Sequence, residues 1–238
     1  MPLPIWQECL AGLEEARLRR STVYFGFGVP RGDGSAVIVV PGFLGTDVRL
    51  AEFRAWLGRI GYRGAYSGVR INDDCPNLLV DQVAGTIRSW ARYTCKTVHL
   101  VGYSYGGLLA RVLAARMPES VRSVMTLGTP FRGISAHPWV LFAADRLREV
   151  ILRRHGTDVE PSCFTGACTC GFLQTLERGV PESVRQAAIY SRTDGCVDWR
   201  MCKTDDPSKD YEVESTHLGL LSNESVYEVV AAVLARSR

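Results

Sequence analysis

The sequence predicts an α/β fold, a mostly parallel and doubly wound sheet with a short helical cap inserted in its second half. Three observations lead to this prediction. The run SAVIVVPG at residues 35–42 is rich in β-branched residues and closed by Pro-Gly, which is typical of a strand buried on both faces. Strand-like and helix-like segments alternate from this run to residue 130, the order expected of a parallel sheet with helices on both faces. The 238 residues contain no internal repeat and no low-complexity linker, so a single domain can hold the whole chain.

The individual elements follow from hydrophobic periodicity and from the Gly and Pro residues that interrupt it. The expected strands lie at residues 35–42, 63–70, 96–102, 121–128, 186–191 and 210–215. The expected helices lie at residues 48–62, 77–94, 105–118 and 222–238. Asn77 is available to cap the second of these helices, and Ser222, Glu224 and Ser225 give the last one a polar cap region.

The alternation of strands and helices stops after residue 130. A long amphipathic segment at 137–156, a cysteine-rich loop and a short helix at 171–179 separate the fourth expected strand from the fifth. Insertions of this size usually serve as lids or binding loops. We therefore expect one domain, residues 1–238, with a cap or lid insertion at about residues 134–184.

The composition excludes several classes of protein. Charged residues at 22% and hydrophobic residues at 46% are ordinary globular values and exclude a disordered or coiled-coil chain. The net charge of +3 is small and its basic residues are scattered, so we expect no nucleic-acid partner. Apolar runs stay well below the roughly 18 residues of a transmembrane segment. The first twenty residues carry acids and bases where a signal peptide would be apolar, so we expect a cytoplasmic protein.

The eight cysteines leave three interpretations open. Without a signal peptide the default is reduced thiols, and local disulfides or a metal site are the alternatives. The group Cys163, Cys168 and Cys170 lacks paired C-x-x-C spacing, and we expect no metal and no cofactor. Cys196 and Cys202 flank one short loop and are the first candidates for a disulfide.

The segment VGYSYGG contains a G-x-S-x-G pattern, Gly102 to Gly106, between an expected strand and an expected helix. This context is typical of a nucleophile elbow, in which a strained serine needs small neighbours because strand and helix nearly touch. The alternative is a glycine-rich turn that binds phosphate through its amides. Such a loop would follow the first strand and carry a Lys or a G-x-G-x-x-G order, which this segment lacks. We therefore interpret Ser104 as a nucleophile.

A nucleophilic serine needs a base, and the base needs an acid that orients it. Of the four histidines, His99 lies inside a strand and His137 and His155 lie in the cap. His217 follows the last strand, at the edge of a doubly wound sheet where ligands bind.

Two aspartates follow the penultimate strand and can serve as the acid. Asp194 comes directly off the strand and precedes a glycine, so it is the preferred acid, with Asp198 as the alternative. The order Ser104, Asp194, His217 is the chain order of the α/β-hydrolase triad.

The tetrahedral intermediate of acyl transfer also needs hydrogen-bond donors. The expected donors are the backbone N–H groups of Tyr105, just after the serine, and Phe43, after the first strand. Candidate substrate-binding side chains are Tyr103, Leu44 and Phe131, with Phe43 beside them. The apolar cap face either lines an acyl pocket or simply packs a helix; its residues are Trp139, Leu141, Phe142 and Leu147.

Five motifs together, PGFLGT, VGYSYGG, LGTPFRG, YSRTDGCVDW and STHLGL, resemble α/β-hydrolases of the bacterial lipase/esterase type. That group includes triacylglycerol lipases and GPI inositol-deacylase-like lipases. The resemblance covers residues ~35–135 and ~185–238 and leaves the N-terminal helix and the cap unplaced. It implies hydrolysis of a small-molecule or lipid ester through an acyl-serine, and it places Ser104, Asp194 and His217 on the triad and Phe43 and Tyr105 on the oxyanion hole. Pro41 departs from the family, because many lipases carry His there, and no calcium-site pattern is evident.

Three functions remain open at this stage. The first is an esterase or lipase. The second is an acyltransferase or a cyclising thioesterase, which uses the same triad but passes the acyl group to an alcohol or amine. The third is a non-catalytic ligand-binding protein on a hydrolase scaffold, against which the complete set of serine, aspartate and histidine argues.

Overall fold

A single parallel sheet forms the centre of the molecule. The structure, a computed structural model, describes residues 3–133, 135–156 and 170–237. In this part of the chain the strands are ordered β2-β1-β3-β4-β5-β6, and every neighbouring pair is parallel. The strands are β1 Ala36–Val40, β2 Arg63–Tyr66, β3 Val98–Tyr103, β4 Val121–Leu127, β5 Arg185–Tyr190 and β6 Asp210–Glu212. The predicted α/β class with a parallel, doubly wound sheet is confirmed.

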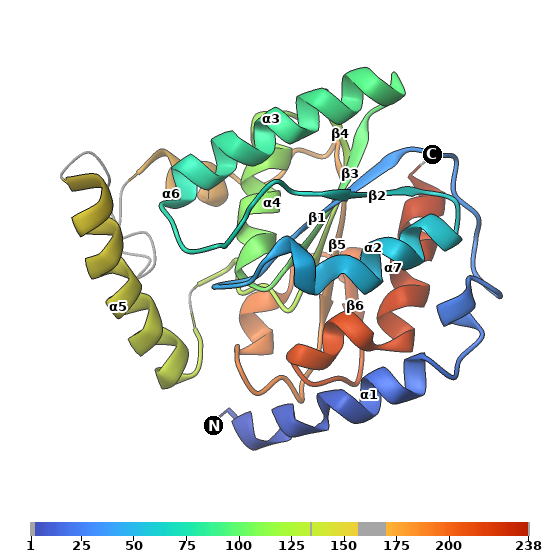
Figure 1. Cartoon of the computed structure of the whole chain (residues 1–238), viewed down its shortest axis with the longest axis horizontal. Helices are drawn as coiled ribbons and strands as arrows, with labels where there is room; N and C mark the ends of the chain where they lie inside the picture. Colours follow the sequence, from blue (N-terminus) through green and yellow to red (C-terminus); the bar gives the residue numbers. More distant parts are fainter. Residues whose placement is uncertain (1–2, 134, 157–169, 238) are drawn as a thin grey trace.

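Helices cover both faces of this sheet (Figure 1). They are α1 Ala11–Leu18, α2 Ala51–Arg59, α3 Pro76–Thr94, α4 Tyr105–Arg116, α5 Pro138–His155, α6 Gly171–Arg178 and α7 Glu224–Arg236. Helices α3, α4 and α6 pack on one face, and α2 and α7 pack on the other. Within the described residues, none of the helices is both long and apolar enough to cross a membrane.

Strand β1 shows why the sheet carries two cores. All five of its side chains are buried, and they alternate between the two faces. Ile38 and Val40 belong to the core under α3 and α4, whereas Val37 and Val39 belong to the core under α2 and α7. A strand buried on both faces is a continuous apolar run, which is the pattern that predicted it.

Aromatic side chains hold α2 and α7 together on the second face. The ring centroids of Trp56 and Tyr227 lie 4.3 Å apart, and the Phe53 ring meets Tyr227 edge-to-face at 5.0 Å. The Trp56 Nε1–H donates to the carbonyl of Val23 at 2.8 Å, so its polar atom is satisfied in the core. This cluster fixes the C-terminal helix, whose preceding loop carries His217.

The predicted helix caps were wrong. Helix α3 begins at Pro76, whose fixed φ and missing N–H suit the first helical position, so Asn77 lies inside the first turn. Helix α7 is capped by Asn223, whose Oδ1 accepts from the amides of Ser225 at 3.0 Å and Val226 at 3.4 Å. Asn223 can accept from these amides because it directly precedes the helix. Ser222 is one residue further away and ends a short 3-10 helix, η8 Leu218–Ser222.

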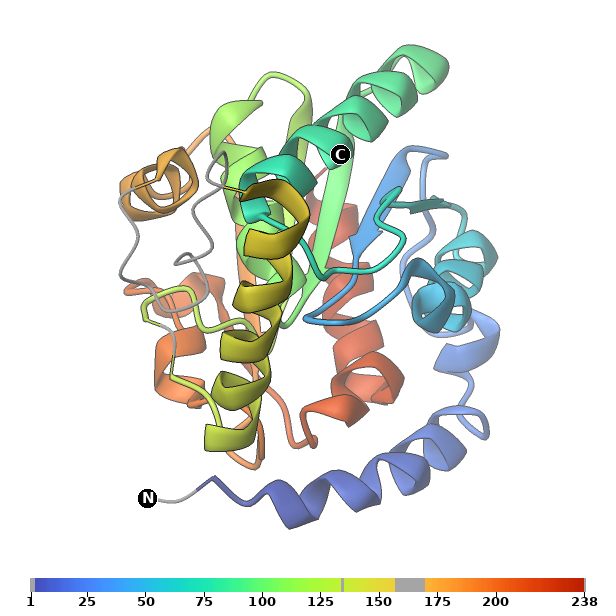
Figure 2. The same cartoon turned by 60° about the vertical axis from the view of Figure 1, so that its left-hand side comes forward.

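The described parts of the predicted cap differ in how they attach to the sheet. Helix α5 lies beside the body of the molecule (Figures 1 and 2). His155 at its C-terminal end pairs with Asp74 at 2.8 Å, and Ile151 packs against Cys75. Helix α6 instead packs on α4 as part of the main core, through Phe172 and Leu173. Residues 134 and 157–169 of the predicted insertion lie outside the described residues, and its extent stays a prediction.

The backbone is tightly packed where β3 turns into α4. A Cβ atom added to Gly102 would lie 2.3 Å from the Cα of Gly107, and one added to Gly106 would lie 2.3 Å from the carbonyl oxygen of Pro41. Such distances to backbone atoms leave no room for a side chain. The end of β1, the end of β3 and the start of α4 therefore touch backbone to backbone.

We predict that Gly106→Ala destabilises the fold by about 1–3 kcal/mol, because the added methyl overpacks a contact between backbones. Gly85→Ala is the matched control. Gly85 lies in the middle of α3 with open space around it, so alanine there should stabilise the fold by about 0.5–1 kcal/mol. Urea unfolding at pH 7 measures both changes, and equal midpoints for Gly106→Ala and wild type would show that this backbone contact tolerates a side chain.

Candidate active site

Ser104 occupies a strained position between β3 and α4. Its backbone dihedral angles, φ 52° and ψ −127°, lie outside the regions that non-glycine residues favour. Its amide donates to the carbonyl of Leu127 at 2.7 Å, and its own carbonyl accepts from the Gly107 amide at 2.9 Å and the Thr129 hydroxyl at 2.8 Å. These hydrogen bonds hold Ser104 in this strained backbone conformation. The serine hydroxyl thereby lies at the C-terminal end of β3.

His217 and Asp194 approach this serine from two later loops. His217 follows β6 and Asp194 follows β5, and both side chains are buried, with only 6% and 1% of their surfaces exposed. The Oγ of Ser104 lies 3.0 Å from His217 Nε2, and His217 Nδ1–H donates to Asp194 Oδ2 at 2.6 Å. The structure brings together the three residues that the sequence selected.

The second carboxylate oxygen of Asp194 is held by its own loop. Oδ1 accepts from the amides of Cys196 and Val197, both at 2.8 Å. Asp198, the alternative acid, instead accepts from the amide of Arg200 at 3.0 Å and pairs with its guanidinium. Asp194 is therefore the aspartate whose free oxygen faces the imidazole.

The loop after β1 passes directly beside the serine. A Cβ added to Gly42 would lie 3.0 Å from the Cβ of Ser104. Buried Asn72 fixes this loop: its side-chain amide donates to the carbonyl of Pro41 at 2.7 Å, and its backbone carbonyl accepts from Leu44 at 2.9 Å. Asn72 is a site residue that the sequence interpretation missed, because nothing local marks an asparagine in a loop 31 residues away.

Phe43 and Tyr105 both lie beside Ser104. Tyr105 is the first residue of α4, so its amide lies at the positive end of the helix dipole. The rings of Phe43 and Tyr105 meet edge-to-face, with centroids 6.4 Å apart. Both residues line a small hollow with Ser104.

Two hollows meet at Ser104. The first has a volume of about 60 Å³ and an almost entirely apolar lining that includes Leu108, Val140 and Leu141. The second has a volume of about 290 Å³ and is lined by Leu44, Tyr103 and His217 among others. An extended molecule bound at Ser104 would thus meet an apolar wall from α4 and α5 on one side and a wider hollow on the other.

A family model described as palmitoyl protein thioesterase matches residues 72–232, well over half of the chain. The chain belongs to the palmitoyl protein thioesterase family. The match includes Ser104, Asp194 and His217 but not the loop that carries Phe43.

Other comparisons extend beyond this thioesterase family. Two triacylglycerol lipases, from Pseudarthrobacter phenanthrenivorans and Burkholderia plantarii, are each 36% identical over 107 residues. These residues make up 41% of this chain, and the match spans only about a third of the length of either relative.

Solved structures share the fold. A structure described under the metagenome-derived lipolytic enzymes LipS and LipT has a TM-score of 0.61 at 17% identity, over 87% of this chain and 96% of the other. Mature Bacillus licheniformis lipase BlEst2 has a TM-score of 0.58 at 17% identity, over 88% of this chain and 96% of the other. The α/β-hydrolase fold that the sequence motifs implied is confirmed for this thioesterase-family chain.

The other three histidines have different partners. His99 is buried in β3 with Nδ1 2.7 Å from the hydroxyl of Ser123, and burial lowers its pKa to about 4. His137 precedes α5, where its ring nitrogen accepts from the amide of Trp139. His155 pairs with Asp74 at the opposite end of α5.

The expected substrate-binding residues divide into two groups. Leu44 and Tyr103 line the wider hollow, and Tyr103 donates its hydroxyl to the carbonyl of His217 at 3.1 Å. Burial and the nearby Asp194 carboxylate raise the pKa of the Tyr103 hydroxyl, so it stays a donor. Phe131 is a correction: it lies away from both hollows because the guanidinium of Arg111 stacks on its ring at 3.9 Å.

The four apolar residues of the predicted cap face also fall into two groups, one facing the body of the molecule and one facing solvent. Leu141 lines the small hollow and Leu147 is buried against Cys75 and Ile151. Trp139 and Phe142 project outward, with 71% and 53% of their surfaces exposed. The expected apolar cap face is therefore only partly turned toward the serine.

Cys196 and Cys202, the first candidates for a disulfide, are both free thiols, as the default of reduced cysteines predicted. Burial raises the pKa of the Cys196 thiol to about 12, and the Glu8 and Asp194 carboxylates act in the same direction. Among the described residues, these three side chains form a group with metal-ligand spacing, all within 4.8 Å. The carboxylates, however, already accept hydrogen bonds from His217 and from backbone amides. Cys163 and Cys168 lie outside the described residues.

We predict that Asp194→Asn slows the reaction of Ser104 with a fluorophosphonate probe by about 10³–10⁴-fold, because the imidazole loses its orienting anion. The asparagine oxygen can still accept the amides of Cys196 and Val197, so the loop should keep its shape. Asp198→Asn is the control and should react at the wild-type rate. Labelling followed by mass spectrometry measures both rates; slow labelling of Asp198→Asn with normal labelling of Asp194→Asn would reverse the assignment of the acid.

Proposed function

We propose that this protein is a serine hydrolase that cleaves carboxylic esters through Ser104, His217 and Asp194. The observation that carries the proposal is the buried chain of contacts from Ser104 Oγ to His217 Nε2 at 3.0 Å and from His217 Nδ1 to Asp194 Oδ2 at 2.6 Å. A serine, an imidazole and a carboxylate at these distances form the arrangement that activates a hydroxyl for attack on an acyl group. Similarity to triacylglycerol lipases and to lipolytic structures supports the same reaction class.

The proposed reaction begins with attack by Ser104 Oγ on the ester carbonyl. His217 accepts the hydroxyl proton, and Asp194 stabilises the resulting imidazolium. The imidazolium then donates this proton to the leaving alcohol, which leaves the acyl group on Ser104. Water, deprotonated by His217, attacks the acyl-enzyme and releases the carboxylic acid and free Ser104.

Negative charge develops on the carbonyl oxygen in both steps. We assign its stabilisation to the backbone amides of Tyr105 and Phe43, two residues that line a hollow together with Ser104. The position of Tyr105 at the N-terminus of α4 supports this role, because the helix dipole favours an anion there. One such donor is worth on the order of 10²–10³ in rate.

The shape of the site supports an acyl group bound between α4 and α5. Leu108 and Leu141 line the small hollow alone and Val140 lines both, whereas the wider hollow, also mostly apolar, is lined in addition by Arg49. We therefore assign the small hollow to the start of the acyl chain and the wider hollow to the leaving group.

Thioester hydrolysis is the second candidate reaction, and the match to the palmitoyl protein thioesterase model favours it. The same triad can cleave an S-acyl group, with a thiol as the leaving group. Because a thiolate leaves more easily than an alkoxide, this reaction depends less on the proton that His217 donates. A thioester and an oxyester with the same acyl chain distinguish the two substrates.

We predict that the wild-type protein hydrolyses p-nitrophenyl esters and that Ser104→Ala lowers kcat by about 10⁴-fold or more. A series of acyl chain lengths, measured beside acyl-CoA thioesters of the same lengths, should show one shared optimum, because both substrates place the same acyl chain in the small hollow. Ser123→Ala is a suitable control, since Ser123 is buried in β4 against His99. Undiminished turnover by Ser104→Ala would rule out the proposed mechanism.

A further inference from the structure

The N-terminal segment lies along the loops that carry the proposed acid and base. It consists of a short 3-10 helix, η1 Ile5–Leu10, followed by α1. Both views place it across one end of the sheet, beside the chain that leads into α7 (Figures 1 and 2). Two of its carboxylates, Glu8 and Glu14, accept hydrogen bonds from backbone amides in that part of the chain.

Glu8 joins two loops that are far apart in the sequence. Its Oε1 accepts from the amide of Gly195 and from the amide of His217, each at 2.9 Å, and its Oε2 accepts from the amide of Leu218 at 2.8 Å. Gly195 directly follows Asp194. One carboxylate is therefore bonded to the backbone of the base itself and to the residue after the acid.

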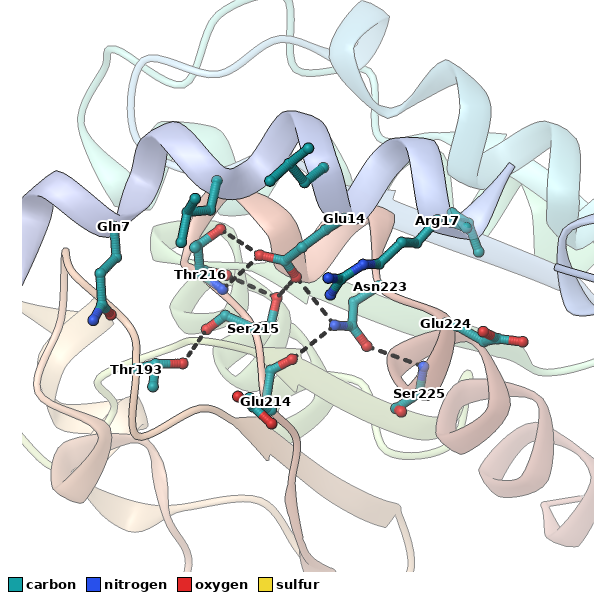
Figure 3. Close-up of a pocket in the computed structure, with 13 residues that line it drawn as sticks. Gln7, Glu14, Arg17, Thr193, Glu214, Ser215, Thr216, Asn223, Glu224 and Ser225 are labelled. Atoms are coloured by element: carbon teal, nitrogen blue, oxygen red, sulfur yellow. Dashed lines mark hydrogen bonds between the residues drawn. The ribbon is translucent and has the colours of Figure 1, made fainter. Parts of the chain in front are cut away.

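Glu14 holds only the loop of the base (Figure 3). It accepts from the amide and hydroxyl of Thr216, both at 2.8 Å, from the hydroxyl of Ser215, and from the side-chain amide of Asn223 at 3.1 Å. These partners precede and follow His217, and within the described part of the chain no hydrogen bond links Glu14 to the loop of Asp194. Glu14 thus provides a natural comparison for Glu8.

The two loops have glycines where the carboxylates approach. A Cβ at Gly195 would lie 2.8 Å from Glu8 Oε1, and a Cβ at Gly219 would lie 2.2 Å from Glu14 Oε1. A side chain at Gly195 would also meet the carbonyl of Pro4 at 2.8 Å. The loops and the N-terminal segment therefore fit each other closely, which a loosely attached terminal helix would not require.

Hydrogen bonds from backbone amides to a carboxylate are about twice as strong as neutral ones, and three of them converge on Glu8. They restrain the loop of His217 relative to the loop of Asp194 across a gap of 23 residues in the chain. The imidazole must stay aligned with both the acid and the serine hydroxyl, and a shift of about 1 Å can cost roughly 100-fold in rate.

We propose that Glu8 is a positioning residue of this active site, which sets the imidazole of His217 against Asp194 by holding the backbones of both loops. The proposal rests on the proposed function of these residues. Glu8 lies outside both hollows that meet at Ser104, so its effect should fall on kcat and not on KM.

Four variants test this proposal. Glu8→Ala removes the two oxygens that accept all three hydrogen bonds. Glu8→Gln keeps one oxygen for Gly195 and His217, while water can reach the exposed amide of Leu218. Glu14→Ala removes at least as many bonds from the same N-terminal segment without touching the loop of Asp194. Glu15→Ala is the surface control, because Glu15 pairs with Arg19 on the solvent side.

Each variant is measured for kcat and KM on the best p-nitrophenyl ester, for Tm, and for the downfield NMR signal of the His217 Nδ1 proton shared with Asp194. We expect Glu8→Ala to lower kcat by about 10- to 100-fold with KM nearly unchanged and to weaken the NMR signal. Glu8→Gln should recover most of the lost kcat, and Glu15→Ala should match wild type. Glu14→Ala should lower Tm at least as much as Glu8→Ala but lower kcat less.

Two results would overturn the assignment of Glu8. One is a Glu8→Ala protein with wild-type kcat and an unchanged NMR signal. The other is a loss of kcat that follows Tm equally in Glu8→Ala and Glu14→Ala, without recovery in Glu8→Gln, which would make Glu8 a structural anchor only. The NMR signal needs no substrate, so an inactive wild-type protein would refute the proposed function while the role of Glu8 could still be measured.

Discussion

The backbone contact between β3, α4 and the end of β1 is the constraint on which the rest of the structure depends. Gly102, Gly106 and the carbonyl of Pro41 meet at distances that exclude any side chain, and this contact forces Ser104 into a strained conformation. Strain of this kind costs about 1–3 kcal/mol and persists only where the surroundings over-determine it. Here the bonds to Leu127, Gly107 and Thr129 and the two buried cores provide that support.

The parallel sheet explains why the other parts of the site lie around the turn at Ser104. A parallel sheet collects the carboxyl ends of all its strands at one edge, so the loops after β1, β5 and β6 all reach the serine. Each loop needs its own restraint, because a loop is held less firmly than a strand. Asn72 restrains the first loop, two amides restrain Asp194, and the N-terminal segment bridges the loops of Asp194 and His217.

The sequence predicted those features that depend on local patterns. The strand at β1, the turn at Ser104 and the order of the elements follow from periodicity and glycine spacing, and His217 and Asp194 could be selected by their places after strands. Phe131 was misassigned because its ring stacks with the guanidinium of Arg111, a residue of α4, and no local sequence pattern marks this contact. Glu8 was missed for the same reason: its partners are 187 to 210 residues distant, and an acid on a terminal helix normally faces water.

The proposed mechanism makes Ser104 the nucleophile and the backbone amides of Phe43 and Tyr105 its oxyanion site. A crystal structure of the protein after reaction with a fluorophosphonate tests this claim most directly. We expect phosphorus bonded to Ser104 Oγ, with the phosphonyl oxygen about 2.7–3.1 Å from the backbone nitrogens of Phe43 and Tyr105. A probe attached to any other residue, or a phosphonyl oxygen turned away from both amides, would contradict it.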